Sequence, residues 1–181
     1  RPDNVPSEWM NYNTRFYNIE SMAKASVMLD NDDYMKKSMT DMLHFIEATN
    51  GRIEAGVPTG RDIESANRVL NFPGLLAAYL DTDYLNGEAL TAMLKWLWQE
   101  STYLYNGAGI LYNGATDEPT ANNYAETNRG LWHSRSFEGV CTYFPEFADR
   151  NDWKTVADMR LNTVSHVLLN DDGCYQEPTF G

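Results

Sequence analysis

The sequence has few basic residues and no long apolar run. Only 14 of its 181 residues are lysine or arginine, against 26 aspartates and glutamates, and the formal net charge is -12. Nucleic-acid binders use clustered lysine and arginine to neutralise phosphates, so this charge argues against a nucleic-acid partner. No apolar stretch reaches the roughly 18 residues that a transmembrane helix needs, so we expect no membrane span.

Cysteine is also scarce. Cys141 and Cys174 lie far apart in the sequence and do not form the closely spaced pair typical of a zinc site. They either pair with each other or stay free. The acidic clusters at residues 30–33 and 170–172 are typical of helix and turn caps rather than of calcium sites. We therefore predict no metal and no cofactor.

The chain begins with Arg1 and its last residues have no tail-like composition, so we expect it to be a piece of a longer protein. Any export signal would lie upstream of Arg1. With 43% hydrophobic residues, the chain is long enough to bury the core of one domain or of a large part of one.

Apolar residues recur at spacings of three and four, the pattern of a helix with one buried face. Three stripes of this kind are Met35, Met39, Met42, Leu43 and Ile46; Leu90, Met93, Leu94, Leu97 and Ser101; and Trp153, Val156, Ala157, Leu161, Val164 and Leu168. Further helices are predicted over residues 14–30, 62–80 and 128–148. Pro73 either kinks the second of these or starts a new helix.

Polar, glycine-containing segments separate the predicted helices. They cover residues 49–60, 81–88 and 105–128, and the last is long enough to indicate a functional loop. Alternating strand patterns are nearly absent. The sequence therefore predicts an all-α fold built from antiparallel helix pairs.

One predicted helix has two organised faces. At about 100° per residue, Phe137, Val140, Cys141 and Phe144 share one face, and Asn128, Trp132, Arg135 and Gly139 share the opposite one. The second face is either an ordinary solvated surface or a binding surface. A solvated face would carry mostly lysine and glutamate, so the tryptophan, arginine and glycine found here favour a binding surface. His133 points to the apolar flank, where a histidine is either a core residue or a catalyst. Glu138 is placed to pair with Arg135 across one turn.

Three segments, "NRGLWHSRSFEGVCTYFPEF", "DWKTVADMRLNTV" and "DDGCYQEPTFG", together resemble the heparinase II/III and alginate lyase group of polysaccharide lyases. The resemblance covers roughly residues 60–181. The matching positions are Asn128, Trp132, Glu138 and Gly139, then Pro145, Glu146 and Phe147, then Asp172, Gly173 and Glu177. Several alginate lyases have histidine after the asparagine, where this chain has Arg129. The tyrosine that acts in the family would fall just beyond Gly181.

The resemblance implies an incomplete (α/α) toroid, with residues 1–181 as part of a single catalytic domain that a β-sandwich domain usually follows. It also implies cleavage of an acidic, uronic-acid-containing polysaccharide by β-elimination, in the periplasm or outside the cell. An acidic chain repels a heavily sulfated polymer, which favours alginate or glucuronan and leaves heparan-type substrates open.

Elimination removes a proton beside an ionised carboxylate, so the enzyme must neutralise that carboxylate with donors already in place. On this basis we expect a catalytic group of Asn128, Arg135 and His133, in which the asparagine amide and an arginine serve as donors. A substrate-binding group would contain Arg129, Trp132, Glu138, Tyr124 and Glu177, with the indole as a stacking platform. Nearby arginines would lower the pKa of a tyrosine base.

Two other functions fit the same residues. A glycoside hydrolase on a closed toroid needs two carboxylates beside the scissile bond, and Glu126, Glu138 and Glu177 are available. A helical glycan-binding protein without catalysis would need only the aromatic and polar face.

Overall fold

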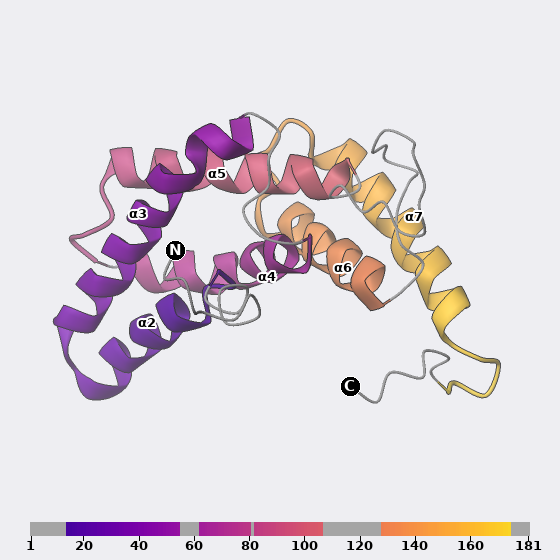
Figure 1. The fold of residues 1–181 in the computed structure, drawn as a ribbon, viewed down its shortest axis with the longest axis horizontal. Coiled ribbons are helices and arrows are strands. Elements are labelled where there is room, and N and C mark those ends of the chain that lie inside the picture. The colour runs from indigo at the N-terminus through magenta and orange to yellow at the C-terminus, as the bar shows by residue number, and fades with distance from the viewer. Residues whose placement is uncertain (1–13, 55–61, 81, 107–127, 175–181) are drawn as a thin grey trace, which may run out of the picture. The chain divides into compact units, whose positions relative to one another are not determined.

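The computed structural model describes residues 14–54, 62–80, 82–106 and 128–174 (Figure 1). This part of the chain contains six α-helices and no β-strand, which confirms the predicted all-α class. The helices are α2 (Tyr17–Leu29), α3 (Asp32–Glu54), α4 (Asp62–Tyr79), α5 (Gly87–Tyr105), α6 (Asn128–Tyr143) and α7 (Arg150–Leu168). Among the described helices, none combines the length and hydropathy required to cross a membrane.

The chain forms two compact units, Arg1–Glu100 and Ser101–Gly181, and the boundary between them falls inside α5. We call them unit 1 and unit 2. The toroidal arrangement of helix pairs and the assignment of all 181 residues to one catalytic domain stay predictions.

In unit 1, α2 and α3 pack side by side through a short connection (Figure 1). Asp30 ends α2 in the left-handed region, with φ of 49°, and its N–H donates to the carbonyl oxygen of Ser26. The side chain of Asn31 then accepts a 3.0 Å hydrogen bond from the N–H of Asp33 in the first turn of α3. These bonds satisfy backbone groups that helix ends leave open, so the polar cluster at residues 30–33 does act as a cap.

Helix α3 is longer than the sequence pattern suggested, because residues 49–54 were expected to be a loop and are helical. Thr49 is buried and its hydroxyl donates to the carbonyl oxygen of Phe45 at 2.7 Å, so the apolar stripe through Ile46 continues for another turn. Packing of this face outweighs the low helix propensity of Gly51. Helix α4 runs through Pro73 as one helix, so the proline does not start a new one.

An aromatic cluster forms the centre of unit 1. The ring of Phe16 lies 5.0 Å from that of Phe45 and 5.3 Å from that of Trp96, and Phe72 lies 5.6 Å from Trp96. Phe16 has a φ of 67°, a left-handed conformation that is costly for a bulky residue. Its side chain is completely buried, and burial of this large apolar ring offsets the backbone strain.

Polar residues on one face of α4 hold the chain on either side of Phe16. Arg15 forms a 2.7 Å ion pair with Glu64, and the hydroxyl of Tyr17 donates to Asn67 at 2.9 Å. The amide of Asn71 donates to the backbone oxygen of Arg15 at 3.3 Å. Because these α4 residues recur at helical spacing, they bind the segment along one continuous line.

Arg68, on the same face of α4, is fully buried. Its Nη2 donates to both carboxylate oxygens of Glu100, at 2.9 and 3.0 Å, and to the hydroxyl of Ser65 at 2.9 Å. Its Nη1 donates to the backbone oxygen of Thr14 at 3.1 Å. The guanidinium also lies 5.3 Å from the centre of the Phe45 ring, within cation–π range. This group links the polar stripe of α4 to the aromatic cluster.

In unit 2, α6 and α7 pack against each other along their apolar faces (Figure 1). Phe137, Val140 and Cys141 are buried as predicted, and the Phe137 ring lies 5.5 Å from that of Trp153. Helix α6 ends at Tyr143 instead of continuing to residue 148. Phe144 therefore lies in the following turn, where it is only half-buried and packs 5.9 Å from Phe147.

Two arginines of α7 bind the carbonyl ends of other helices. Arg150 donates through Nε to the carbonyl oxygen of Cys141 at 3.0 Å. The buried Arg160 donates to the carbonyl oxygens of Leu104 and Tyr105, at 2.8 and 2.6 Å, in the last turn of α5. Cationic donors at these positions satisfy open carbonyl groups and oppose the negative end of the helix dipole.

Cys141 and Cys174 are both free thiols in the structure and do not form a disulfide, so the second of the two predicted alternatives holds. Cys174 is exposed, and Cys141 is buried in the α6–α7 packing. Burial raises the pKa of the Cys141 thiol to about 11, although the charges of Arg150 and Lys154 act in the opposite direction. The thiol is therefore protonated and unreactive at neutral pH.

Candidate functional site on helix α6

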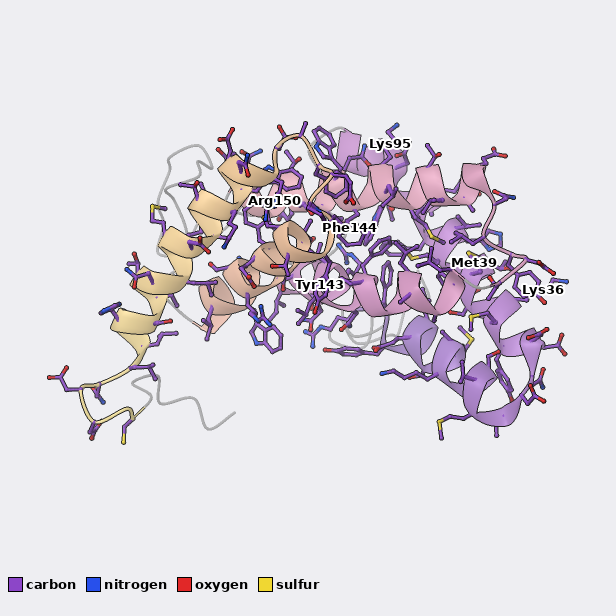
Figure 2. All side chains as sticks on the ribbon, turned by 180° about the vertical axis from the view of Figure 1, so that it is seen from behind. Lys36, Met39, Lys95, Tyr143, Phe144 and Arg150 are labelled. Carbon is purple, nitrogen blue, oxygen red and sulfur yellow. The ribbon has the colours of Figure 1, made fainter. Side chains whose placement is uncertain are left out.

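Helix α6 has a buried side against α7 and an exposed side that carries the residues of interest. On the buried side, Phe137, Val140 and Cys141 are almost completely covered. On the exposed side, Trp132 has 42% of its surface accessible and Tyr143 has 66%. Figure 2 shows Tyr143 leaving the C-terminal end of α6 on the other side of the helix from Phe144 and Arg150. The predicted exposed face is therefore confirmed for Trp132 and Arg135, but the prediction is wrong for Gly139, which is buried.

Arg135 and Glu138 form an ion pair across one turn of α6, as the sequence predicted. The hydroxyl of Thr142 donates to the other carboxylate oxygen of Glu138 at 3.0 Å. The Arg135 side chain remains 60% exposed, and its contact with Glu138 goes through Nη1. Since a guanidinium has five N–H donors, the pairing holds the group in place while most of its donors still face solvent.

Gly139 lies on the same side of the helix as Trp132. A Cβ atom added to it would meet no other atom within 4 Å in the described part of the chain. Gly139 itself is nevertheless buried, so the helix backbone is not open to a ligand at this point.

His133 lies away from the exposed side, and only 3% of its surface is accessible. The adjacent Ser134 and Ser136 are also buried, and their hydroxyls donate back to the carbonyl oxygens of Gly130 and Trp132, both at 2.7 Å. The structure therefore does not bring His133 together with Trp132 and Arg135 on one surface.

Other predicted site residues are placed only in part. Asn128 and Arg129 form the start of α6, and their side chains lie outside the described residues. Tyr124 and Glu177, together with the alternative carboxylate Glu126, also lie outside the described residues.

Tyr143 is a further exposed aromatic residue of α6 that the sequence pattern did not single out. It follows Trp132 by about three helical turns, so the two side chains leave the helix in nearly the same direction. The helical wheel was the available signal, because it places Tyr143 beside Trp132 and Gly139. Because the helix was expected to continue to residue 148, the sequence did not predict that Tyr143 is its last residue.

The charge of α6 differs from that of the chain as a whole. The helix contains two arginines and one glutamate, in a chain with a formal net charge of -12. The local excess of positive charge suits an anionic ligand. In the described ranges, no group of three or more histidine, cysteine, aspartate or glutamate side chains is placed to hold a metal ion.

Comparison with protein families gives a match over the whole chain. The family model described as heparinase II/III N-terminus matches residues 1–181. Searches among curated proteins and among solved structures found no significant match.

Proposed function

Because the chain belongs to the heparinase II/III N-terminus family, we propose that it is the helical domain of a polysaccharide lyase that cleaves a uronic-acid-containing polymer by β-elimination. The family, which matches all 181 residues, supplies the lyase class. The proposal adds the reaction type, the substrate class and the residues that bind it.

The observation that carries the proposal is the exposed side of α6. An accessible indole at Trp132 and an oriented, exposed cation at Arg135 lie less than one turn apart on this helix. A pyranose ring has an apolar face that stacks on an indole, and a uronate has a carboxylate that pairs with a guanidinium. These two side chains therefore correspond to the two parts of a uronic acid, its ring face and its carboxylate.

The chemical problem for such an enzyme is the acidity of the C5 proton. Removal of this proton develops a second negative charge on the neighbouring carboxylate group. We propose that Asn128 donates its amide hydrogens to this carboxylate and that Arg135, assisted by Arg129, adds a fixed positive charge. Donors placed in this way are worth on the order of 3 kcal/mol each in the transition state.

The remaining predicted residues take supporting roles in the proposal. Glu138 orients Arg135, with which it is paired. Tyr124 and Glu177 are proposed to contact the substrate. His133 is proposed to act from the buried side of α6, where it would fix the orientation of the helix instead of touching the polymer. A tyrosine from outside residues 1–181 would serve as base and acid.

An unsulfated polymer fits the electrostatics better than a sulfated one. The chain has a net charge of -12, and α6 has only a small excess of positive charge to oppose it. A polymer with one carboxylate per sugar is repelled less than one that also carries sulfates. We therefore propose alginate or glucuronan as the substrate.

The test uses the full-length protein with alginate, glucuronan and heparan sulfate. Elimination breaks the bond between C4 and the glycosidic oxygen, which takes up a proton, and leaves a C4–C5 double bond that absorbs in the ultraviolet. Hydrolysis adds water across the glycosidic bond and yields reducing ends without a double bond. We expect absorbance to rise with one of the first two polymers and Asn128→Ala to lower kcat by about a hundredfold or more. Asn162→Ala, which changes an exposed asparagine of α7, is the matched control.

Three outcomes would contradict the proposal in different ways. Reducing ends without the double bond would indicate a hydrolase, and binding without turnover would indicate a glycan-binding protein. Near-normal turnover by a correctly folded Asn128→Ala variant would remove that residue from the mechanism.

A further inference from the structure

We propose that Glu138 determines which polymers the candidate site accepts, because it neutralises Arg135 and so favours sugars with one carboxylate over sugars that also carry sulfate. Thr142 is the positioning residue that holds the Glu138 carboxylate in place. We call Arg135, Glu138 and Thr142 the α6 ion-pair group. This inference rests on the proposed function, since it concerns the same site, and it names the residue that discriminates between polymers.

The carboxylate of Glu138 is bound at both of its oxygens. Its Oε2 accepts a hydrogen bond from Nη1 of Arg135, and its Oε1 accepts one from the hydroxyl of Thr142 at 3.0 Å. The same hydroxyl lies 3.2 Å from the backbone oxygen of Glu138, four residues earlier in the helix. Only 22% of the Glu138 side chain is exposed, so its charge is held in one place beside the guanidinium.

Arg135 keeps one edge of its guanidinium for a ligand. In the part of the chain that the structure describes, its hydrogen bond to Glu138 uses Nη1, and no bond of Nε or Nη2 is present. A guanidinium binds a carboxylate through two parallel N–H donors, and the edge formed by Nε and Nη2 suits this geometry. Because the side chain is 60% exposed, a sugar carboxylate can reach that edge from solvent.

The charges of the α6 ion-pair group explain why it accepts one carboxylate and disfavours further anions. The positive charge of Arg135 and the negative charge of Glu138 cancel before a ligand arrives. One bound carboxylate makes the local charge negative, so a sulfate on the same sugar is repelled. A unit charge about 6 Å away in water changes an affinity roughly threefold. Without the Glu138 charge, one bound carboxylate would leave the site neutral and this repulsion would be absent.

The neighbouring helix α7 contributes a lysine whose charge is also balanced. Lys154 donates through Nζ to both oxygens of Asp158, at 2.8 and 3.0 Å. This hydrogen bond is the main cause that raises the pKa of Lys154, and the charge of Glu138 raises it further. Lys154 is therefore within electrostatic reach of Glu138, but a sulfate would find it already paired with a carboxylate.

The test compares one polymer with and without sulfate, in the full-length protein. Calorimetry at low salt gives the affinities for glucuronan and for the same glucuronan after chemical sulfation, and alginate with its sulfated form is a second pair. We expect Glu138→Gln to raise the affinity for the sulfated polymer, relative to the unsulfated one, about threefold. The amide oxygen still accepts from Arg135 while the negative charge is gone. High salt should abolish the change, since it screens exposed charges.

Glu20→Gln is the matched control. Glu20 is also a partly exposed member of a helical ion pair, with Lys24, and this substitution changes the net charge of the chain by the same amount. Thr142→Val should shift the affinity ratio in the same direction as Glu138→Gln but by less, whereas Thr142→Ser should keep the wild-type ratio. A general loss of stability lowers both affinities and leaves their ratio unchanged.

The outcomes separate this inference from the proposed function. An unchanged ratio in Glu138→Gln, or an equal shift in Glu20→Gln, would overturn the inference, and normal turnover by the wild type would leave the lyase intact. A wild-type ratio in Thr142→Val would remove Thr142 from the positioning role. Polymer binding without turnover would overturn the lyase, while the affinity ratio would still decide the role of Glu138. A wild-type protein that binds neither pair of polymers would overturn both.

Discussion

The buried guanidinium of Arg68 provides a quantitative test of how unit 1 is held together. In Arg68→Ala, the carboxylate of Glu100 would lose both of its hydrogen bonds to Nη2 while it remains buried. Removing one partner of a buried ion pair typically costs about 3–5 kcal/mol, since the remaining charge stays desolvated. The variant also loses the bond to the Thr14 carbonyl and the contact with the Phe45 ring.

A loss of this size is a large fraction of the roughly 5–15 kcal/mol that stabilises a typical domain. We therefore expect the urea midpoint of Arg68→Ala to fall sharply in unfolding followed by circular dichroism. The double variant Arg68→Met with Glu100→Gln should recover part of the loss, because it removes both charges and fills most of the volume. This recovery would identify the unpaired carboxylate as the main cause.

Lys24→Ala is the matched control, since the exposed pair of Lys24 and Glu20 should contribute less than about 1 kcal/mol. The reasoning would be refuted if Arg68→Ala and Lys24→Ala lowered the unfolding free energy by the same small amount. It would also be refuted if the double variant were no more stable than Arg68→Ala.

Further predictions concern a thiol, an indole and a second buried arginine. Since the pKa of Cys141 is raised to about 11 in the fold and lies near 8.5 in an unfolded chain, its stabilising contribution is complete below pH 8.5 and is lost as the pH rises toward 11. Cys141→Ala should therefore flatten the fall in unfolding free energy over this range, measured by urea titration at each pH. Trp132→Ala should weaken polymer affinity about tenfold in calorimetry, whereas Trp98→Ala, which changes an equally exposed indole of α5, should not. Arg160→Met should lower the unfolding free energy by about 2 kcal/mol or more in urea titration, because two carbonyl groups at the end of α5 lose their donors, and an unchanged midpoint would contradict this role.

The sequence predicted the six helices because their apolar stripes repeat at helical spacing. Met35, Met39 and Met42 are buried as their spacing required. The end of α3 was missed because Gly51 and its polar neighbours are typical of loops, and only the burial of Thr49 shows why the helix continues. Tertiary packing therefore determines where α3 ends, and this end cannot be predicted from local helix propensity.

The buried arginines were not predictable from sequence pattern. Arg68 and Arg160 are fully enclosed, although arginine is usually exposed. Their partners are groups distant in the sequence, such as Glu100 for one and the carbonyl of Leu104 for the other. At the candidate site, the wheel correctly separated Trp132 and Arg135 from the buried side, since that separation depends on one helix alone.

The bonds of Arg160 to the end of α5 have a consequence for how unit 2 is held together. Helix α5 is fastened to α7 by Arg160, and α6 packs on the same α7, so the two helices that flank residues 107–127 are both secured by a third one. The atoms that form the Arg160 bonds all belong to residues outside this segment. The ends of α5 and α6 in unit 2 therefore have a common anchor in α7, whatever the length of the connection between them.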